Sequence, residues 1–373
     1  PQKSNGCAAV EFQTQLIDRF FVGFEHPIDY SSAFRKVLKE EYDVEEEIGV
    51  RIDLTSGCCL LDYLIEQSQI SHKDLKELVS GASIVCRRGI LNKLLNCPWK
   101  YSSEFRFAVK QFHGIYFIKE ISTETYQKQY VARFIDPHGL LPKFKNHVIR
   151  DFGNASYIPP KEVSTWEQMQ GLYLCDLSLL SEAKYLKIFY GTELDAFDNE
   201  DNVVEIKLQK GELNPSNSGY YFSEKIRKWY FQNELIGSDT VVVGFHQDKV
   251  VTSIKKIKNN TLPYMISPEN RWDDSTSFYA AANILSTVLE VYEQNVGRDE
   301  TLLVELLPKT TDILYHVCDD NIHHILSDAF KDAFEDNEAE VYHDPDMIMK
   351  TGYLIEGKKN GWLDAALEKS LKI

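Results

Sequence analysis

The chain of 373 residues has no uninterrupted apolar run near the roughly 18 residues that a membrane-spanning helix needs. It also has no Cys-x-x-Cys pair: its seven cysteines are an odd set in which only Cys58 and Cys59 are neighbours. This pattern favours free thiols in a reducing compartment over a disulfide framework. We therefore expect no membrane contact and a cytoplasmic location, with the nucleus as the alternative.

Sequence motifs of several common enzyme classes are also missing. The chain contains no Gly-x-Ser-x-Gly, no P-loop and no Gly-x-Gly-x-x-Gly. A serine hydrolase, a nucleotide kinase and a dinucleotide-binding enzyme are therefore unsupported. His316, Cys318, His323 and His324 are metal ligands by residue type, but they lack the spacing of a zinc site. We interpret them as surface residues of an amphipathic helix over 316–334.

Acidic residues outnumber basic ones by 57 to 41, which gives a formal net charge of −16. This balance argues against a protein that coats nucleic acid non-specifically, but it allows a local basic channel that leads to an acidic metal site in an RNA enzyme. Internal repeats and linkers rich in Pro, Gly or Ser are absent, and aromatic residues make up 12% of the chain, enough for a large core. We expect one domain over residues 1–373 and a monomer.

Apolar periodicity predicts both helices and strands. The first 50 residues look irregular and end in an acidic run. Strand pairs are expected around turns at His113-Gly114 and Gln247-Asp248. Helices are expected over 60–78 with Ser71 as an N-cap, from near Ser164, over 221–237 with Ser223 as a cap, over 275–294, and from 362 to the end.

Tyr190 to Lys210 carries the clearest chemistry. Its first apolar-alternating run contains Glu193 and Asp195, and its second contains Glu205 and Lys207. Residues i and i+2 share one face of a strand, so a hairpin would place three carboxylates and one ammonium side by side. Such carboxylates bind Mg²⁺, which activates water for phosphoryl transfer.

The alternative is a solvated hairpin face whose cross-strand pairs contribute about 0.2–1 kcal/mol each. The strongly apolar strand VVEIK argues for burial instead. Buried carboxylates are costly unless a metal or a partner compensates them.

Four segments, in order, carry a resemblance to a known family: CRRGILNKLLNCPW, GTELDAF, VVEIK and KIRKWYFQNELIGSDTVVVGF. Their order and spacing resemble those of the decapping exoribonuclease (DXO) family of RNA 5′-end quality-control enzymes. That family includes the fungal partner of the nuclear 5′-to-3′ exoribonuclease. The best match runs from about Ile84 to Ile257. The resemblance implies an α+β fold: one domain of two packed mixed β-sheets flanked by helices, with a PD-(D/E)XK-nuclease-like catalytic core.

The resemblance also implies roles for individual residues. It implies that the metal ligands are Glu193, Asp195, Glu205 and the backbone carbonyl of Ile206, holding two ions of Mg²⁺ or Mn²⁺. It further implies that Lys207 lies beside the attacking water, that Gln232 lies on the neighbouring helix, and that Arg87, Arg88, Gly89 and Cys175 lie near the substrate.

One family motif departs from its usual form here. Members have Gly-x-x-x-Glu upstream of the Glu-x-Asp motif, and that glutamate helps to hold the metals. The counterpart in this chain, Gly153 to Tyr157, has tyrosine at that place. An alternative, Gly114 to Ile118, also lacks it, although Glu120 follows two residues later. One fewer carboxylate should weaken or reshape the binding of one metal.

The resemblance implies a fungal-type member that acts on capped or 5′-monophosphate RNA. Such a member cleaves after the first nucleotide, releases the whole cap dinucleotide and then digests the RNA 5′ to 3′. Removal of pyrophosphate from a 5′ triphosphate should be lost or weak. The alternatives are a 5′-triphosphate pyrophosphohydrolase that partners a 5′-to-3′ exoribonuclease, and a non-catalytic stabiliser of that nuclease.

Overall fold

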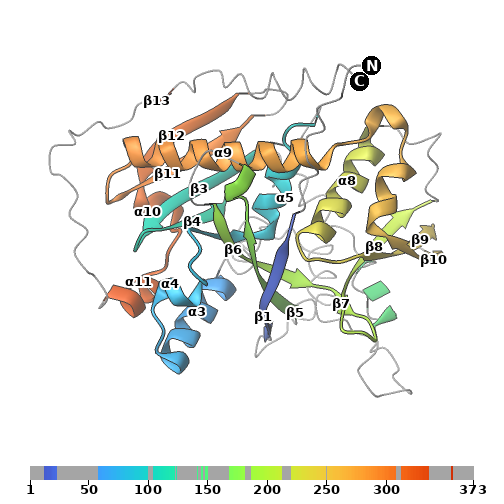
Figure 1. Ribbon diagram of the computed structural model, residues 1–373, viewed down its shortest axis with the longest axis horizontal. Coiled ribbons are helices and arrows are strands. Elements are labelled where there is room, and N and C mark those ends of the chain that lie inside the picture. The colour runs from blue at the N-terminus through green and yellow to red at the C-terminus, as the bar shows by residue number, and fades with distance from the viewer. Residues whose placement is uncertain are drawn as a thin grey trace, which may run out of the picture.

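The computed structural model describes residues 12–22, 58–99, 104–121, 168–180, 186–211, 220–248, 250–307, 312–335 and 354–355, with 123, 141, 144–145 and 148–149. In these residues the strands form two sheets (Figure 1). The larger sheet has nine strands in the order β1 (Thr14–Val22), β5 (Gln168–Asp176), β6 (Lys187–Leu194), β2 (Ile84–Arg87), β4 (Ile115–Glu120), β3 (Phe105–Phe112), β11 (Glu300–Leu306), β12 (Ile313–Asp319) and β13 (Leu354–Ile355). The smaller has four, in the order β10 (Val250–Lys258), β9 (Thr240–Gln247), β8 (Val203–Lys210) and β7 (Ala196–Phe197).

Both sheets are mixed. Strand β2 pairs in parallel with β4 and with β6, and β8 pairs in parallel with β9, whereas the remaining pairs are antiparallel. The expected α+β fold with two mixed sheets is therefore confirmed. A single domain over residues 1–373 stays a prediction, because long stretches lie outside the described residues.

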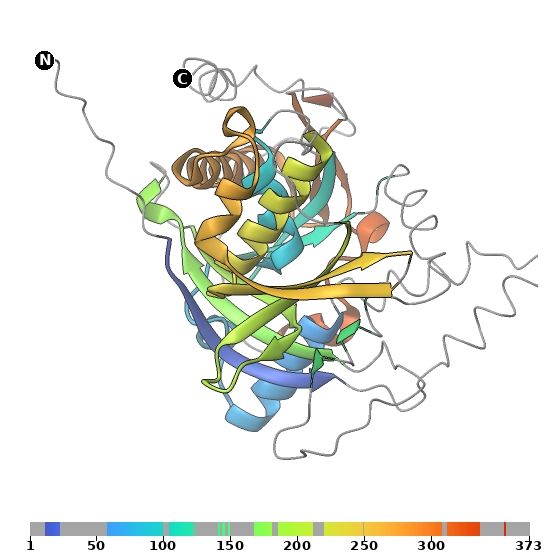
Figure 2. The ribbon, with the colours of Figure 1, turned by 90° about the vertical axis from the view of Figure 1, so that its right-hand side faces the viewer.

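Helices cover both faces of the larger sheet, and the alternation of buried residues along its strands explains why. In β2, Ile84 and Cys86 join the core cluster beneath the helices of one face, whereas Val85 points to the cluster on the other. The first face is covered by α5 (Arg88–Asn96), α8 (Tyr220–Glu234) and α9 (Asp274–Asn295), the second by α3 (Cys58–Ser71), α4 (Leu75–Leu78) and α11 (Asp328–Phe334). Figure 2 shows α8 and α9 on one side of the sheets and α3 on the other.

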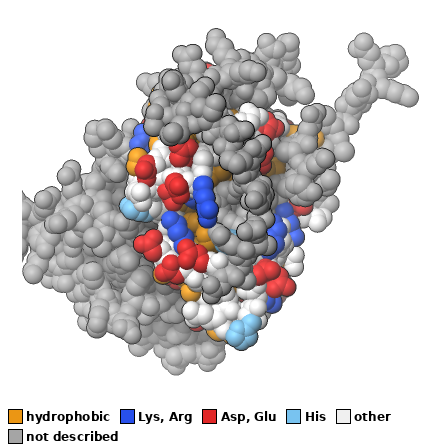
Figure 3. Space-filling model, turned by 90° about the vertical axis from the view of Figure 1, so that its left-hand side faces the viewer, with side chains coloured by type: hydrophobic (Ala, Val, Ile, Leu, Met, Phe, Trp, Pro, Cys, Tyr) orange, Lys and Arg blue, Asp and Glu red, His pale blue; other side chains and the backbone are white. Residues whose placement is uncertain are grey.

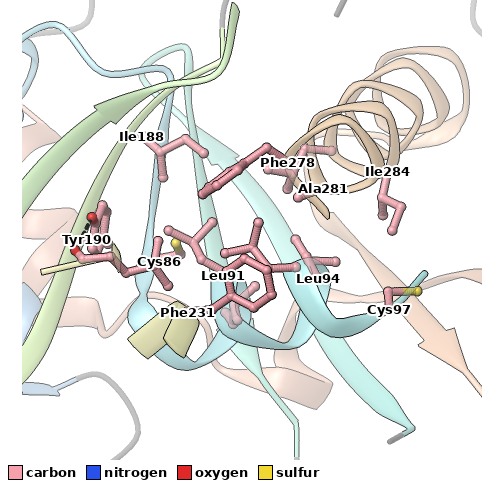
Figure 4. Packing of buried hydrophobic residues seen from close by; sticks show 14 of the residues in the cluster. Cys86, Leu91, Leu94, Cys97, Ile188, Tyr190, Phe231, Phe278, Ala281 and Ile284 are labelled. Carbon is pink, nitrogen blue, oxygen red and sulfur yellow. Dashed lines mark hydrogen bonds between the residues drawn. The ribbon is translucent and has the colours of Figure 1, made fainter. Parts of the chain in front are cut away.

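The central packing joins α9 to α5 (Figure 4). Phe278 and Ala281 of α9 point toward Leu91 and Leu94 of α5, and all four side chains are buried. Phe231 of α8 meets Phe278 edge to face, with ring centroids 6.0 Å apart. This packing holds α5, and with it the start of α5 at Arg88, against the larger sheet.

Several expected elements are confirmed. The β3–β4 turn lies at His113 and Gly114, which both have positive φ, and the β9–β10 turn includes Asp248 with a φ of 47°. The helix expected over 275–294 is α9. Short 3₁₀ turns lie at Ser178–Leu180, Asn259–Met265 and Pro268–Asn270.

The two helix caps expected from the sequence are wrong. Ser71 is the last residue of α3. The next helix, α4, begins at Leu75, and its N-cap is Asp74, whose side chain accepts from the Glu77 N–H at 2.7 Å in a capping box. Ser223 is buried inside the first turn of α8 rather than preceding it. In both cases apolar periodicity predicts a helix, but it does not specify which of the nearby polar residues is the N-cap.

Two element assignments also need correction. The N-terminal stretch is not wholly irregular, because Thr14–Val22 is strand β1, which pairs with β5 far along the chain. His316 and Cys318 lie in strand β12 rather than a helix, and α10 (Asp320–His323) is a single turn. The ladder with β11 prevails over the local helical pattern there.

The helix start near Ser164, the acidic run before residue 50, the segment 153–157 and the final helix from 362 lie outside the described residues. None of the described helices is long and apolar enough to cross a membrane. Among the described side chains on the face shown in Figure 3, acidic and basic groups are interspersed.

Candidate active site

The Glu-x-Asp motif lies where the chain passes from one sheet to the other. Glu193 belongs to β6 of the larger sheet, opposite Gln170, and β6 ends at Leu194. Asp195 follows, and Ala196 begins β7 of the smaller sheet. The expected hairpin therefore exists as β7 and β8, but Glu193 belongs to the neighbouring sheet.

A hydrogen bond connects this junction to the second motif. The Oδ2 atom of Asp195 accepts from the backbone N–H of Ile206 at 2.7 Å. Ile206 lies in β8 between Glu205 and Lys207. The bond thus places Asp195 against the strand that carries the other two predicted residues.

Glu205 is the most deeply buried acid of this group, with 1% of its surface exposed. Its carboxylate accepts from Arg88 Nη1 and, at 2.5 Å, from Lys207 Nζ. Burial alone would raise the pKa of Glu205, but the charges of Arg88 and Lys207 outweigh burial and hold the pKa well below its usual range. Glu205 is therefore held as a carboxylate by two cations.

Asp195 and Glu193 share a third cation, Lys145. Its Nζ lies 2.6 Å from Asp195 Oδ1 and 3.2 Å from Glu193 Oε1. Burial, with a smaller contribution from the charge of Glu205, raises the pKa of Asp195 despite the nearby lysines. Burial would lower the pKa of Lys145, but Asp195 and Glu193 outweigh it and raise that pKa.

Sequence reasoning missed Lys145. It lies 48 residues before Glu193, outside the four segments that carry the family resemblance. The charge balance of the motifs could have indicated such a residue. The motifs contain three acids and one lysine, and buried acids need further positive charge nearby.

The three acids differ in exposure to solvent, so the site has an exposed side and a buried side. The exposed fraction of the side chain is 41% for Glu193, 8% for Asp195 and 2% for Glu205. A substrate would therefore approach past Glu193, and Glu205 forms the floor.

The other predicted residues lie around this floor. Arg88 is the first residue of α5 and also donates to the backbone carbonyl of Gln232 at 3.4 Å, which places α8 beside the site. Arg87 Nη1 donates to Gln170 Oε1 at 3.2 Å, next to Glu193 in the sheet register. The first-motif arginines, the acids and the helix of Gln232 are thus brought together.

Gly89 and Glu120 lie close to each other. A Cβ atom on Gly89 would lie 3.3 Å from Glu120 Oε2, so glycine leaves room for this carboxylate. Glu120, which we considered as a substitute for the missing family glutamate, pairs with Lys93 at 2.6 Å.

Cys175 lies apart from this group. It is buried in β5 opposite Ile188, and burial raises the pKa of its thiol well above the usual value. Five positions along β5 separate it from Gln170, a distance of about 16 Å in a strand. Its predicted place near the substrate stays a prediction.

The donor chemistry fits a hard divalent ion, because carboxylate oxygens are the ligands that Mg²⁺ and Mn²⁺ favour. No three acidic, His or Cys side chains within the described part of the chain are already arranged as metal ligands. The reason is visible in the contacts: Arg88, Lys207 and Lys145 bind the carboxylates, and the Ile206 N–H takes one further oxygen. Binding an ion would require some oxygens to exchange these partners, and the role of the Ile206 carbonyl stays a prediction.

Comparison with known proteins identifies relatives of this chain. A family of RAI1-like PD-(D/E)XK nucleases matches residues 25–134 and 181–331. Decapping nuclease dom-3 of Caenorhabditis elegans is 26% identical over 306 residues, which cover 76% of this chain and 75% of that protein. The human decapping and exoribonuclease protein is 26% identical over 277 residues, covering 70% of this chain and 65% of that protein.

Solved structures show the same fold. Rai1 of Candida albicans, in complex with pU5 and Mn²⁺, matches with a TM-score of 0.57 at 17% identity, over 74% of this chain and 80% of that one. Rai1 of Scheffersomyces stipitis matches with a TM-score of 0.55 at 18% identity and the same coverage. The expected nuclease-like fold and the hydrolase class are confirmed. This chain belongs to the family of RAI1-like PD-(D/E)XK nucleases.

Proposed function

We propose that this protein is a metal-dependent nuclease that removes caps from RNA 5′ ends. The observation that carries the proposal is the convergence of Glu193, Asp195 and Glu205, with Lys207, at the junction of the two sheets. The names of the worm and human relatives support decapping, and the complex of Candida albicans Rai1 with pU5 and Mn²⁺ supports RNA and a divalent ion as ligands.

The finer reaction follows from the sequence resemblance. The enzyme would cleave after the first nucleotide, release the intact cap dinucleotide and continue as a 5′-to-3′ exonuclease. The second candidate is a 5′-triphosphate pyrophosphohydrolase, and the third is a non-catalytic stabiliser of an exoribonuclease. The retained acids and Lys207 favour an enzyme over the stabiliser.

Glu193, Asp195 and Glu205 would hold the ion. When bound, it would make a coordinated water more acidic and neutralise charge that grows on the phosphate. Lys207 orients the attacking water or stabilises the equatorial phosphate oxygens, because its ammonium is fixed by Glu205 at 2.5 Å. Arg88 keeps Glu205 ionised and, with Gln232, positions the strand at the floor of the site.

The decisive experiment incubates RNA labelled at its 5′ cap or triphosphate with the protein and Mg²⁺ or Mn²⁺. A labelled cap dinucleotide supports our proposal, pyrophosphate supports the second candidate, and no metal-dependent product supports the third. Asp195→Asn should abolish product formation. Asp248→Asn, in the exposed β9–β10 turn, serves as a matched control and should retain it.

The same proposal includes Mg²⁺ or Mn²⁺ as the ion and the cytoplasm as the location. Cys86, Cys97, Cys175 and Cys318 are free thiols in the described residues, which suits a reducing compartment. A monomeric state and an exoribonuclease partner stay predictions. The expected pair of divalent ions would add four positive charges to the site. The contacts of Lys145 with two of the acids affect how many ions can bind.

A further inference from the structure

The acidic site already contains its own cations. Three carboxylates face Arg88, Lys207 and Lys145, so the described cluster carries no formal net charge. Arg88 and Lys207 both bind Glu205 on the buried side. Lys145, whose side chain is 22% exposed, bridges the other two acids, Glu193 and Asp195.

Lys145 is held at this place by the residue before it. Phe144 is 5% exposed and its ring covers Gly244 of β9. A Cβ atom on Gly244 would lie 2.5 Å from Phe144 Cζ, so the ring fits there only because residue 244 has no side chain. The Ile149 N–H donates to the Lys145 carbonyl at 2.9 Å in a helical turn, which fixes the backbone. Lys145 is therefore anchored in the fold.

We infer that Lys145 is an internal cation that takes the place of one divalent ion, so that the active site binds a single Mg²⁺ or Mn²⁺. The inference rests on the proposed function, because it concerns the same metal site. The ammonium contacts one oxygen of Glu193 and one of Asp195, and a divalent ion bound between these two acids would need the same oxygens. The single ion would bind between Asp195 and Glu205, where each carboxylate would exchange one of its present partners for the ion.

Electrostatics gives the expected size of the effect. A cation within about 4–6 Å lowers the affinity of a carboxylate for a proton by roughly 10–1000-fold, because the proton and the cation repel each other. A second divalent ion bound to Glu193 and Asp195 would lie within similar reach of the Lys145 ammonium. Removal of this charge should therefore strengthen binding of a second ion at least about tenfold.

The test counts bound ions directly. Mn²⁺ is titrated into the full chain, and free Mn²⁺ is measured by its electron paramagnetic resonance signal. We expect a single bound ion for the wild type and for Lys145→Arg, and a second ion for Lys145→Gln. Lys331→Gln removes a lysine paired with Asp320 elsewhere in the fold, and it should bind like the wild type. Thermal melting without metal checks that each variant is folded.

Two bound ions in the wild type, or no gain of a second ion in folded Lys145→Gln, would overturn the inference. The labelled-RNA assay separates this result from failure of the proposed function. A wild type that cleaves RNA and binds two ions leaves the function intact but removes the role of Lys145. Absence of Mn²⁺ binding in every variant, together with absence of cleavage, overturns both.

Discussion

The carboxylate of Asp195 accepts a hydrogen bond from the backbone N–H of Ile206 at 2.7 Å, and its other oxygen contacts Lys145. One side chain thus joins the junction between the sheets to β8 and also faces the candidate metal site. Its structural and chemical roles can be separated, because an amide retains an acceptor oxygen but loses the charge.

Asp195→Asn and Asp195→Ala should both abolish metal-dependent RNA cleavage, but they should differ in stability. Alanine leaves the buried Ile206 N–H without its partner, which costs about 1–3 kcal/mol, whereas asparagine retains an acceptor. Urea unfolding of both variants measures the difference. Equal stabilities would show that this hydrogen bond does not hold the junction.

The pair of Arg88 and Glu205 should be strongly coupled. Arg88→Met leaves a buried carboxylate with Lys207 alone, and the expected loss in the free energy of unfolding is about 3 kcal/mol. Glu205→Gln in the Arg88→Met background should recover part of that loss. A double-mutant cycle by urea unfolding should give a coupling of about 1–3 kcal/mol. Additive effects of the two changes would contradict the pairing.

Gly244→Ala should destabilise the protein by about 1–3 kcal/mol, because the new methyl group overlaps the ring of Phe144. Displacement of Phe144 should also disturb Lys145 and change Mn²⁺ binding. Gly297→Ala is the control, since its methyl group would meet only the flexible side chain of Glu300. Chemical unfolding and Mn²⁺ titration of both variants test this, and equal behaviour would argue against the anchoring role of Phe144.

The half-buried acid Glu234 should make stability depend on pH. Burial raises the pKa of Glu234 above its ordinary value of 4.5, although it accepts from Asn259 Nδ2 at 2.6 Å. The folded state then holds the proton more tightly than the unfolded state. Stability conferred by the protonated form is therefore lost as the pH rises from about 4.5 through the raised pKa.

Glu234→Gln removes this titration, so the variant should gain stability relative to the wild type between pH 4 and pH 7. Urea unfolding across that range measures the change, and Glu290→Gln on the exposed side of α9 is the control. A stability difference between Glu234→Gln and the wild type that is independent of pH would contradict the assignment.

Local patterns predicted much of the framework. The β3–β4 and β9–β10 turns and α9 follow from apolar periodicity and turn residues close in sequence. Errors arose where distant pairing decides the conformation, as in β1 with β5 and in β12 with β11. Local propensity is a weak guide there, because the partner strand supplies the hydrogen bonds.

For the candidate site, the sequence by itself determined the types and order of the acids, Lys207 and the family to which the chain belongs. Only the tertiary structure decided that Glu193 and Asp195 lie at the junction of two sheets, that Glu205 is enclosed by Arg88 and Lys207, and that Lys145 joins them. Motifs record neighbours along the chain, whereas the charge balance of a buried site depends on every side chain that the fold brings within a few ångströms. Lys145 belongs to no motif, and its place follows from the packing of Phe144 on Gly244.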